Sequence, residues 1–449
     1  MIKKNIIFFL LLILLNNCSF DSKTGIWGDA EKERKRISKL EKDQKEIIKI
    51  EKIYSSDTNF KKEKSLAKSV NLKNPKKNSE WLMSSLNHQN FLGNLYLPTS
   101  NNTFLKKKIG KDKFSFHGNT TPLLVYKSNI IFADDTGTIF NINKYGKIYW
   151  KKNIYKKVYK KIYKNLVFSI YENNIYVADN IGFIYALNLS NGEITWIKNY
   201  GIPIRSNIKI FDNKIFLIDQ TNKILCFNTE DGTLIWDIHS ISSFIKSQNL
   251  LSIAVTKKGE LFVITSSADL FKINSETGRI IWSRNTASTL YADATDFFNS
   301  SNLVIDTDKI FFSSDTSTYS LDLNTGNEIW VNQNVTSIAT PVISGDNIFV
   351  VTNNGYLVIL NKADGKIISS SNILKVLKRK NQETIITGFI MGSNKIYAIT
   401  LNGFMIVSSA NTGKPEYFKK IGGKNIAPLI INEEKLYVLT EDSKIFIFN

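Results

Sequence analysis

The stretch IYVADNIGFIYALNLSNGEITW, residues 175–196, contains most of the unit from which this chain is built. An apolar run leads into a polar turn, a second alternating run and a Gly turn at Gly192, and then a segment that ends on Trp196. Apolar and polar residues that alternate between such turns are typical of antiparallel strands. The stretch therefore predicts three consecutive strands of one small sheet.

The same unit recurs along the chain with a period of 39 to 48 residues. Its turn glycines are Gly146, Gly192, Gly232, Gly278, Gly326, Gly365 and Gly413. Four strands within such a period fit one blade of a β-propeller. The fourth residue after the glycine is Trp in five copies, where its ring is expected to cover the gap between blades. Ser369 and Tyr417 stand there in the other two copies and predict looser packing.

An eighth, partial copy ends the chain as KLYVLTEDSKIFIFN, residues 435–449. It is too short for a blade, and we expect a strand from the region around residues 81–110 to complete it, because closure removes exposed sheet edges. The sequence thus predicts an all-β fold over residues 79–449, an eight-bladed β-propeller of four-stranded blades. A partly helical or disordered tether precedes it, and residues 29–54 are typical of a solvated helix.

The N-terminus, MIKKNIIFFLLLILLNN, has two lysines and an apolar core that is too short to span a bilayer, as in a signal peptide over residues 1–17. The following Cys18, with Leu15 three residues before it, resembles a bacterial lipobox. Cys18 is therefore the expected lipidation site, and a lone cysteine in an ordinary signal peptide is the alternative. Residues 18–78 are then a lipid-anchored charged linker, and Ser19 in place of Asp favours the periplasmic face of the outer membrane.

Composition narrows the possible partners. The net charge of +19 comes from abundant lysine, and basic charge favours anionic membranes or nucleic acid. The chain has no nucleic-acid-binding motif, so no nucleic acid is expected as a partner. After export Cys226 is the only cysteine besides Cys18, which leaves no internal disulfide. Residues 151–164 repeat Tyr every four positions among lysines, which predicts either a basic amphipathic helix or, as we favour, a lysine-rich inter-blade loop.

No catalytic constellation is visible. His88, His117 and His239 lack metal-ligand spacing, and no nucleophile elbow or phosphate loop occurs. Aspartates that recur in equivalent turns are interpreted as turn or cap residues; they are Asp134, Asp135, Asp179, Asp219 and Asp315. The repeats resemble those of quinoprotein dehydrogenases, which hold pyrroloquinoline quinone and Ca²⁺, but the adjacent cysteines frequent in those enzymes are absent. We expect no enzyme, no metal and no cofactor.

The combination of lipobox, repeat number and the entry WLMSSLNHQNFLGNLYLP, residues 81–98, resembles the BamB family, a lipoprotein subunit of the β-barrel assembly machinery. The resemblance implies a non-enzymatic scaffold that docks the periplasmic domains of BamA and supports outer-membrane protein folding and insertion. It implies membrane attachment through the N-terminal lipid, and unfolded outer-membrane proteins as further partners. A quinone-dependent dehydrogenase and an exported ligand-binding propeller remain the alternatives.

The resemblance also suggests which residues contact the partner. The family uses an apolar-x-apolar-Arg loop between blades, and Ile202, Ile204 and Arg205 match it. We expect this loop to be exposed. A second family contact uses acidic residues in a later loop, where Asp293 and Asp296 are the nearest equivalents.

Overall fold

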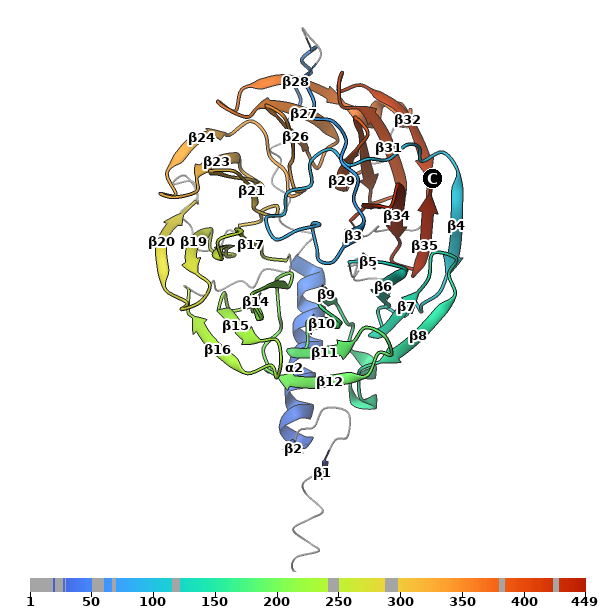
Figure 1. Cartoon of the computed structure of the whole chain (residues 1–449), viewed down its shortest axis with the longest axis vertical. Helices are drawn as coiled ribbons and strands as arrows, with labels where there is room; N and C mark the ends of the chain where they lie inside the picture. The colour runs from blue at the N-terminus through green and yellow to red at the C-terminus, as the bar shows by residue number, and fades with distance from the viewer. Residues whose placement is uncertain are drawn as a thin grey trace, which may run out of the picture.

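The computed structural model describes residues 19–20, 27–28, 30–50, 60–66, 70–114, 122–240, 250–286, 298–378, 384–422 and 428–449. Within these ranges eight antiparallel sheets stand around a common hub, as Figure 1 shows. The predicted eight-bladed propeller is confirmed. The described part also contains one α-helix, α2 (Ala30–Ile50), and a short pair, β1 (Ser19–Phe20) with β2 (Trp27–Gly28).

The first four blades follow one another along the chain. Blade one comprises β5 (Leu124–Tyr126), β6 (Asn129–Ala133), β7 (Thr138–Ile142) and β8 (Ile148–Asn153). Blade two comprises β9 (Leu166–Tyr171), β10 (Asn174–Asp179), β11 (Phe183–Asn188) and β12 (Ile194–Asn199). Blade three comprises β13 (Lys209–Phe211), β14 (Lys214–Ile218), β15 (Ile224–Asn228) and β16 (Leu234–Ile238). Blade four comprises β17 (Ile253–Val255), β18 (Glu260–Ile264), β19 (Asp269–Asn274) and β20 (Ile280–Asn285).

Three further blades repeat this plan. Blade five comprises β21 (Val304–Asp306), β22 (Lys309–Ser313), β23 (Thr318–Asp322) and β24 (Glu328–Asn332). Blade six comprises β25 (Val342–Ser344), β26 (Asn347–Val351), β27 (Tyr356–Asn361) and β28 (Ile367–Asn372). Blade seven comprises β29 (Ile386–Gly392), β30 (Lys395–Thr400), β31 (Phe404–Ser409) and β32 (Pro415–Lys420).

Blade eight combines strands from the beginning and the end of the propeller sequence. Its inner strands are β33 (Ile430–Asn432), β34 (Lys435–Leu439) and β35 (Lys444–Phe448), and its outer strand is β4 (Thr103–Lys108). The register pairs Lys444 with Lys108 and Phe446 with Lys106. The expectation that an N-terminal strand completes the last blade is confirmed.

Because neighbouring strands run antiparallel, the turns fall on two different faces of the disc. Turns between first and second strands, and between third and fourth strands, lie on one face, which we call the hairpin face. Turns between second and third strands share the other face with the links from one blade to the next, and we call it the connection face. The faces matter because the N-terminal region contacts both.

Each tryptophan after a glycine turn interlocks two blades. Trp150 of blade one donates its indole N–H to the Leu189 carbonyl of blade two at 2.9 Å. A Cβ added to Gly192 would lie 2.6 Å from the Trp150 ring, and Gly192 has a φ of +71°. Trp196, Trp236 and Trp330 donate to the next blade in the same way. Glycine is therefore favoured at this position for two reasons: it adopts the positive φ, and it leaves room for the tryptophan ring.

The interlock is weaker where the tryptophan is replaced. The nearest atoms to a Cβ on Gly413 are the hydroxyls of Ser369 and Ser371, at 3.6 Å. This agrees with the looser packing expected at Ser369. The edge of β28 is instead covered by an N-terminal segment, since Lys64 and Ser370 exchange two backbone hydrogen bonds of 3.0 Å. Phe60 of the same segment is buried in the cluster that contains Trp330.

The entry segment, residues 70–97, crosses the hub near the hairpin face (Figure 1). Its β3 (Glu80–Trp81) pairs with β5 of blade one. Backbone bonds then follow to blades two, four, five, seven and eight; they are Ile170 N–H to Leu82 O, Val255 N–H to His88 O, Ile305 N–H to Gln89 O, Ser393 N–H to Leu95 O and Glu433 N–H to Asn78 O. Lys209 and Ser344 add bonds from blades three and six. One segment therefore contacts all eight blades.

Candidate docking surface

The predicted partner loop lies on the connection face between blades two and three, but it is not the exposed loop that we expected. Ile204 is 3% exposed and Arg205 is 8% exposed, while Ile202 is half-buried. The backbone explains this, because Arg205 N–H donates to Ile218 O at 2.8 Å and Leu251 N–H donates to Arg205 O at 2.6 Å. The expected exposure of Ile204 and Arg205 is therefore wrong: the segment is hydrogen-bonded into the propeller.

Arg205 is held without a carboxylate partner among the described residues. Its Nε is buried and has no hydrogen bond in the described part of the chain. Burial lowers its pKa to about 10, and the nearby Tyr163 partly offsets that effect. An apolar-x-apolar-Arg pattern does not reveal such burial, since arginine is ordinarily a surface residue.

Other predicted site residues cannot be placed. Cys18 and the signal sequence, residues 1–17, lie outside the described residues, and so do Asp293 and Asp296. Lipidation at Cys18 and the acidic contact stay predictions. The domain boundaries at residues 17 and 78 stay predictions as well. No helix among the described residues is long and apolar enough to cross a bilayer.

Residues 151–164 comprise the end of β8 and most of the link from blade one to blade two on the connection face. They contain a 3-10 turn, η1 (Lys157–Lys161), and not the amphipathic helix that was the alternative. Tyr155, Tyr159 and Tyr163 are all buried, while the lysines of η1 remain exposed. The favoured interpretation, an inter-blade loop with a lysine-rich face, is confirmed.

Asp179 organises the neighbouring turn of blade two. One carboxylate oxygen accepts the backbone N–H groups of Ile181, Gly182 and Phe183 at 2.7 to 2.9 Å. Its other oxygen accepts the Tyr155 hydroxyl at 2.5 Å. Burial raises the pKa of Asp179, although these four donors act against that rise. The interpretation of the recurring aspartates as turn residues is confirmed for this one.

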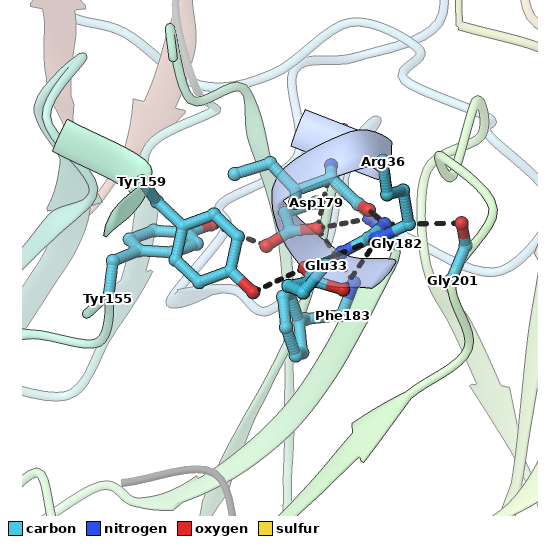
Figure 2. Close-up of polar contacts among 9 residues, drawn as sticks. Glu33, Arg36, Tyr155, Tyr159, Asp179, Gly182, Phe183 and Gly201 are labelled. Carbon is cyan, nitrogen blue, oxygen red and sulfur yellow. Dashed lines mark hydrogen bonds and ion pairs between the residues drawn. The ribbon is translucent and has the colours of Figure 1, made fainter. Parts of the chain in front are cut away.

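Helix α2 rests on this turn and on the adjacent link. The Arg36 guanidinium donates to the backbone carbonyl of Ile181. It also donates to the Gly201 carbonyl, which is 3.1 Å away, as Figure 2 shows. The guanidinium carbon also lies 5.7 Å from the centre of the Phe183 ring. We call this group of acceptors and aromatic rings the α2 seat: Tyr159, Ile181, Phe183 and Gly201. It adjoins Ile202 of the predicted partner loop.

An ion pair within the helix aligns Arg36 in the seat. Arg36 Nη2 lies 2.6 Å from Glu33 Oε1, and the Tyr159 hydroxyl donates to the same oxygen at 2.6 Å. Burial by itself would raise the pKa of Glu33, but the bonds from Arg36 and Tyr159 outweigh it and lower that pKa. Burial raises the pKa of Tyr159, and its bond to Glu33 adds to the rise. At neutral pH Glu33 and Arg36 are therefore both charged, and the Tyr159 hydroxyl keeps its proton.

The apolar part of this contact is small among the side chains of α2 that the structure describes. Ile37 and Leu40 are buried against the blades, at 7% and 9% exposure, while Arg34, Lys35, Ser38 and Lys39 are exposed. Burying two aliphatic side chains contributes ~3–6 kcal/mol before the cost of ordering the helix. The helix therefore docks through a specific polar contact with modest apolar support.

Two lysines, Lys209 and Lys164, are buried. Lys209 donates to the carbonyls of Ser84 and Asn87 in the entry segment at 3.0 and 2.7 Å, and burial lowers its pKa to about 7. Lys164 donates to the carbonyls of Tyr159 and Ile162, and burial lowers its pKa to about 8. Among the described residues no three His, Cys, Asp or Glu side chains form a metal-binding group.

Solved structures that share this fold include a BamB protein and two dehydrogenases. BamB from Moraxella catarrhalis superposes with a TM-score of 0.66 at 12% identity, covering 78% of this chain and 99% of that one. The quinohemoprotein alcohol dehydrogenase from Comamonas testosteroni gives 0.64 at 10% identity, covering 82% and 80%. A europium-containing methanol dehydrogenase gives 0.63 at 11%, covering 80% and 89%. At these identities the likeness shows the fold alone.

The family comes from a comparison of the sequence itself. No curated protein matches the chain. The family profile described as "Outer membrane protein assembly factor BamB" matches residues 135–371, which is more than half of the 449 residues. These matched residues run from blade one into blade six and include the α2 seat. The chain therefore belongs to the BamB family of PQQ-like repeat propellers.

Proposed function

We propose that this chain is a non-enzymatic scaffold of the β-barrel assembly machinery, held at the periplasmic face of the outer membrane by a lipid on Cys18. It docks the periplasmic domains of BamA and so supports the folding and insertion of outer-membrane proteins. The observation that carries the proposal is the match of the BamB family profile to residues 135–371. A closed ring that presents hydrogen-bonded inter-blade links on one face suits a docking role, because those links are already ordered before a partner arrives.

The docking surface proposed here is the link between blades two and three, with Ile202 as its accessible apolar residue. Ile204 and Arg205 contribute by holding the link in place, since both are buried. Substituting them would disturb the fold of blade three, so neither is a clean probe of binding. Asp293 and Asp296 remain proposed as a second, acidic contact.

The test is a titration of BamA periplasmic domains against the full mature chain on a biosensor. Ile202→Asp is expected to weaken binding about tenfold, since it places a charge in an apolar contact. The matched control is Ile338→Asp, which changes an exposed isoleucine in the link between blades five and six. Absence of binding by the unaltered chain would refute the proposed function. Equal weakening by both variants would remove this link from the interface.

The dehydrogenase alternative is kept because quinone-dependent enzymes share the fold. The entry segment crosses the hub and bonds to the inner strands of several blades, at the place where those enzymes would hold the quinone if this chain were one of them. Titration with pyrroloquinoline quinone and Ca²⁺ distinguishes the two functions. A saturable change in quinone absorbance would favour the enzyme, whereas the scaffold predicts none.

A further inference from the structure

Helix α2 occupies a surface that continues into the proposed docking link. Arg36 bonds to Gly201 O, and the next residue is Ile202. A partner that binds the side chain of Ile202 therefore meets α2 at the edge of its contact. Either the partner binds beside the helix, or the helix leaves.

The α2 seat is suited to one kind of chemical group. It offers two backbone carbonyl oxygens and the face of Phe183, which together suit a planar cation with several N–H donors. The carboxylate in the cluster, Glu33, comes from the helix and not from the propeller. Once α2 is removed, the carbonyls of Ile181 and Gly201 and the Tyr159 hydroxyl lose the bonds that Arg36 and Glu33 make to them among the described residues.

The described side chains of α2 make few apolar contacts with the propeller. Only Ile37 and Leu40 among its described side chains are apolar and buried, and most of its other described side chains are exposed. A marginal intramolecular contact of this kind exists as an equilibrium between docked and released states, and a partner that prefers the released state shifts that equilibrium.

We propose that α2 is a displaceable cover on the docking surface, and that the partner replaces it with an arginine-bearing helical segment of its own. The proposal rests on the proposed function for the identity of the partner. The covering contact between α2 and its seat is tested without that partner, so the two ideas fail separately.

The first experiment uses a fluorescent peptide of residues 29–50 and the full mature chain. Arg36→Ala in the protein releases its own helix, and Arg34→Ala is the matched control, because Arg34 is an exposed arginine on the same turn. The peptide is expected to bind the Arg36→Ala protein at least about tenfold more tightly than the unaltered or Arg34→Ala proteins. A peptide that itself carries Arg36→Ala should lose this binding. Equal binding to all three proteins, or no binding to any, would overturn the proposal.

The second experiment titrates BamA periplasmic domains against the same proteins. If α2 is a cover, Arg36→Ala tightens binding about tenfold and the peptide competes with the domains. Unchanged or weaker binding after Arg36→Ala would show that α2 covers nothing the partner needs. Binding to none of the proteins would refute the proposed function and leave the peptide result standing. A peptide-sensitive dimer of the Arg36→Ala protein in sedimentation would identify a second copy of this chain as the occupant instead.

Discussion

The interlock between a tryptophan and the glycine turn of the next blade can be measured with a matched pair of substitutions, Gly192→Ala and Gly413→Ala. Both glycines have a φ of +71° in equivalent turns, so alanine meets the same backbone penalty at each. They differ in surroundings, because the new Cβ would lie 2.6 Å from the Trp150 ring in one case and 3.6 Å from serine hydroxyls in the other.

The left-handed conformation costs alanine ~1–2 kcal/mol, and the loss of unfolded-chain freedom returns ~0.4–1 kcal/mol. Gly413→Ala should therefore destabilise its turn by about 1 kcal/mol. Gly192→Ala adds the displacement of a packed ring, for which overpacking typically costs ~1–3 kcal/mol. The difference between the two variants is the cost of the clash.

Hydrogen exchange of the turn amides, together with thermal unfolding, measures both changes. In a Trp150→Ala background the clash is gone, so Gly192→Ala should cost no more than Gly413→Ala. The expected coupling between Trp150 and Gly192 is ~1–3 kcal/mol. Equal costs at the two glycines, or a coupling near zero, would refute the idea that this contact joins the blades.

Two further predictions concern charge and attachment. Lys209 has a pKa of about 7 in the folded chain against an ordinary 10.5, so between these values the unfolded chain binds the extra proton and stability rises with pH. Lys209→Met should flatten this rise in urea-unfolding midpoints measured from pH 7 to 10. An unchanged slope would show that another group causes the pH dependence of stability. Cys18→Ala is expected to move the protein from the membrane to the soluble periplasmic fraction. Labelling of cells with a fatty acid should mark the unaltered chain. Retention of the variant at the membrane, together with an unlabelled unaltered chain, would contradict lipid anchoring.

The blades were predictable because their determinants are local. A glycine turn, a tryptophan four residues later and alternating apolar runs define strand order and period, and the truncated last copy required an N-terminal strand. The position of β4 in blade eight follows from the missing fourth strand of that last copy. Long-range polar contacts were not predictable in this way. Arg36 bonds to backbone carbonyls, which leave no mark in the sequence pattern.

Burial of charged residues was the main source of error at the site. Arg205 was expected at the surface because it matches an inter-blade loop that the family uses for binding, but backbone pairing with Ile218 and Leu251 encloses it. For Tyr155, Tyr159 and Tyr163 the spacing of four fitted both a helix and a loop, and the structure shows a loop with a short 3-10 turn. The partners of Tyr155 and Tyr159, Asp179 and Glu33, are distant in the sequence. The helix expected to be solvated instead buries Ile37 and Leu40.

The entry segment and β4 also constrain how the protein is made. Residues 70–108 leave the ribosome before any blade exists, yet they pair with strands as distant as Lys444–Phe448. Contacts of such high sequence separation form slowly, because a long loop must close first. The first part of the propeller to be synthesised is thus among the last to be ordered. Maturation should accordingly depend on keeping the early chain extended until its final residues arrive, as a chain threaded unfolded through an export channel naturally is.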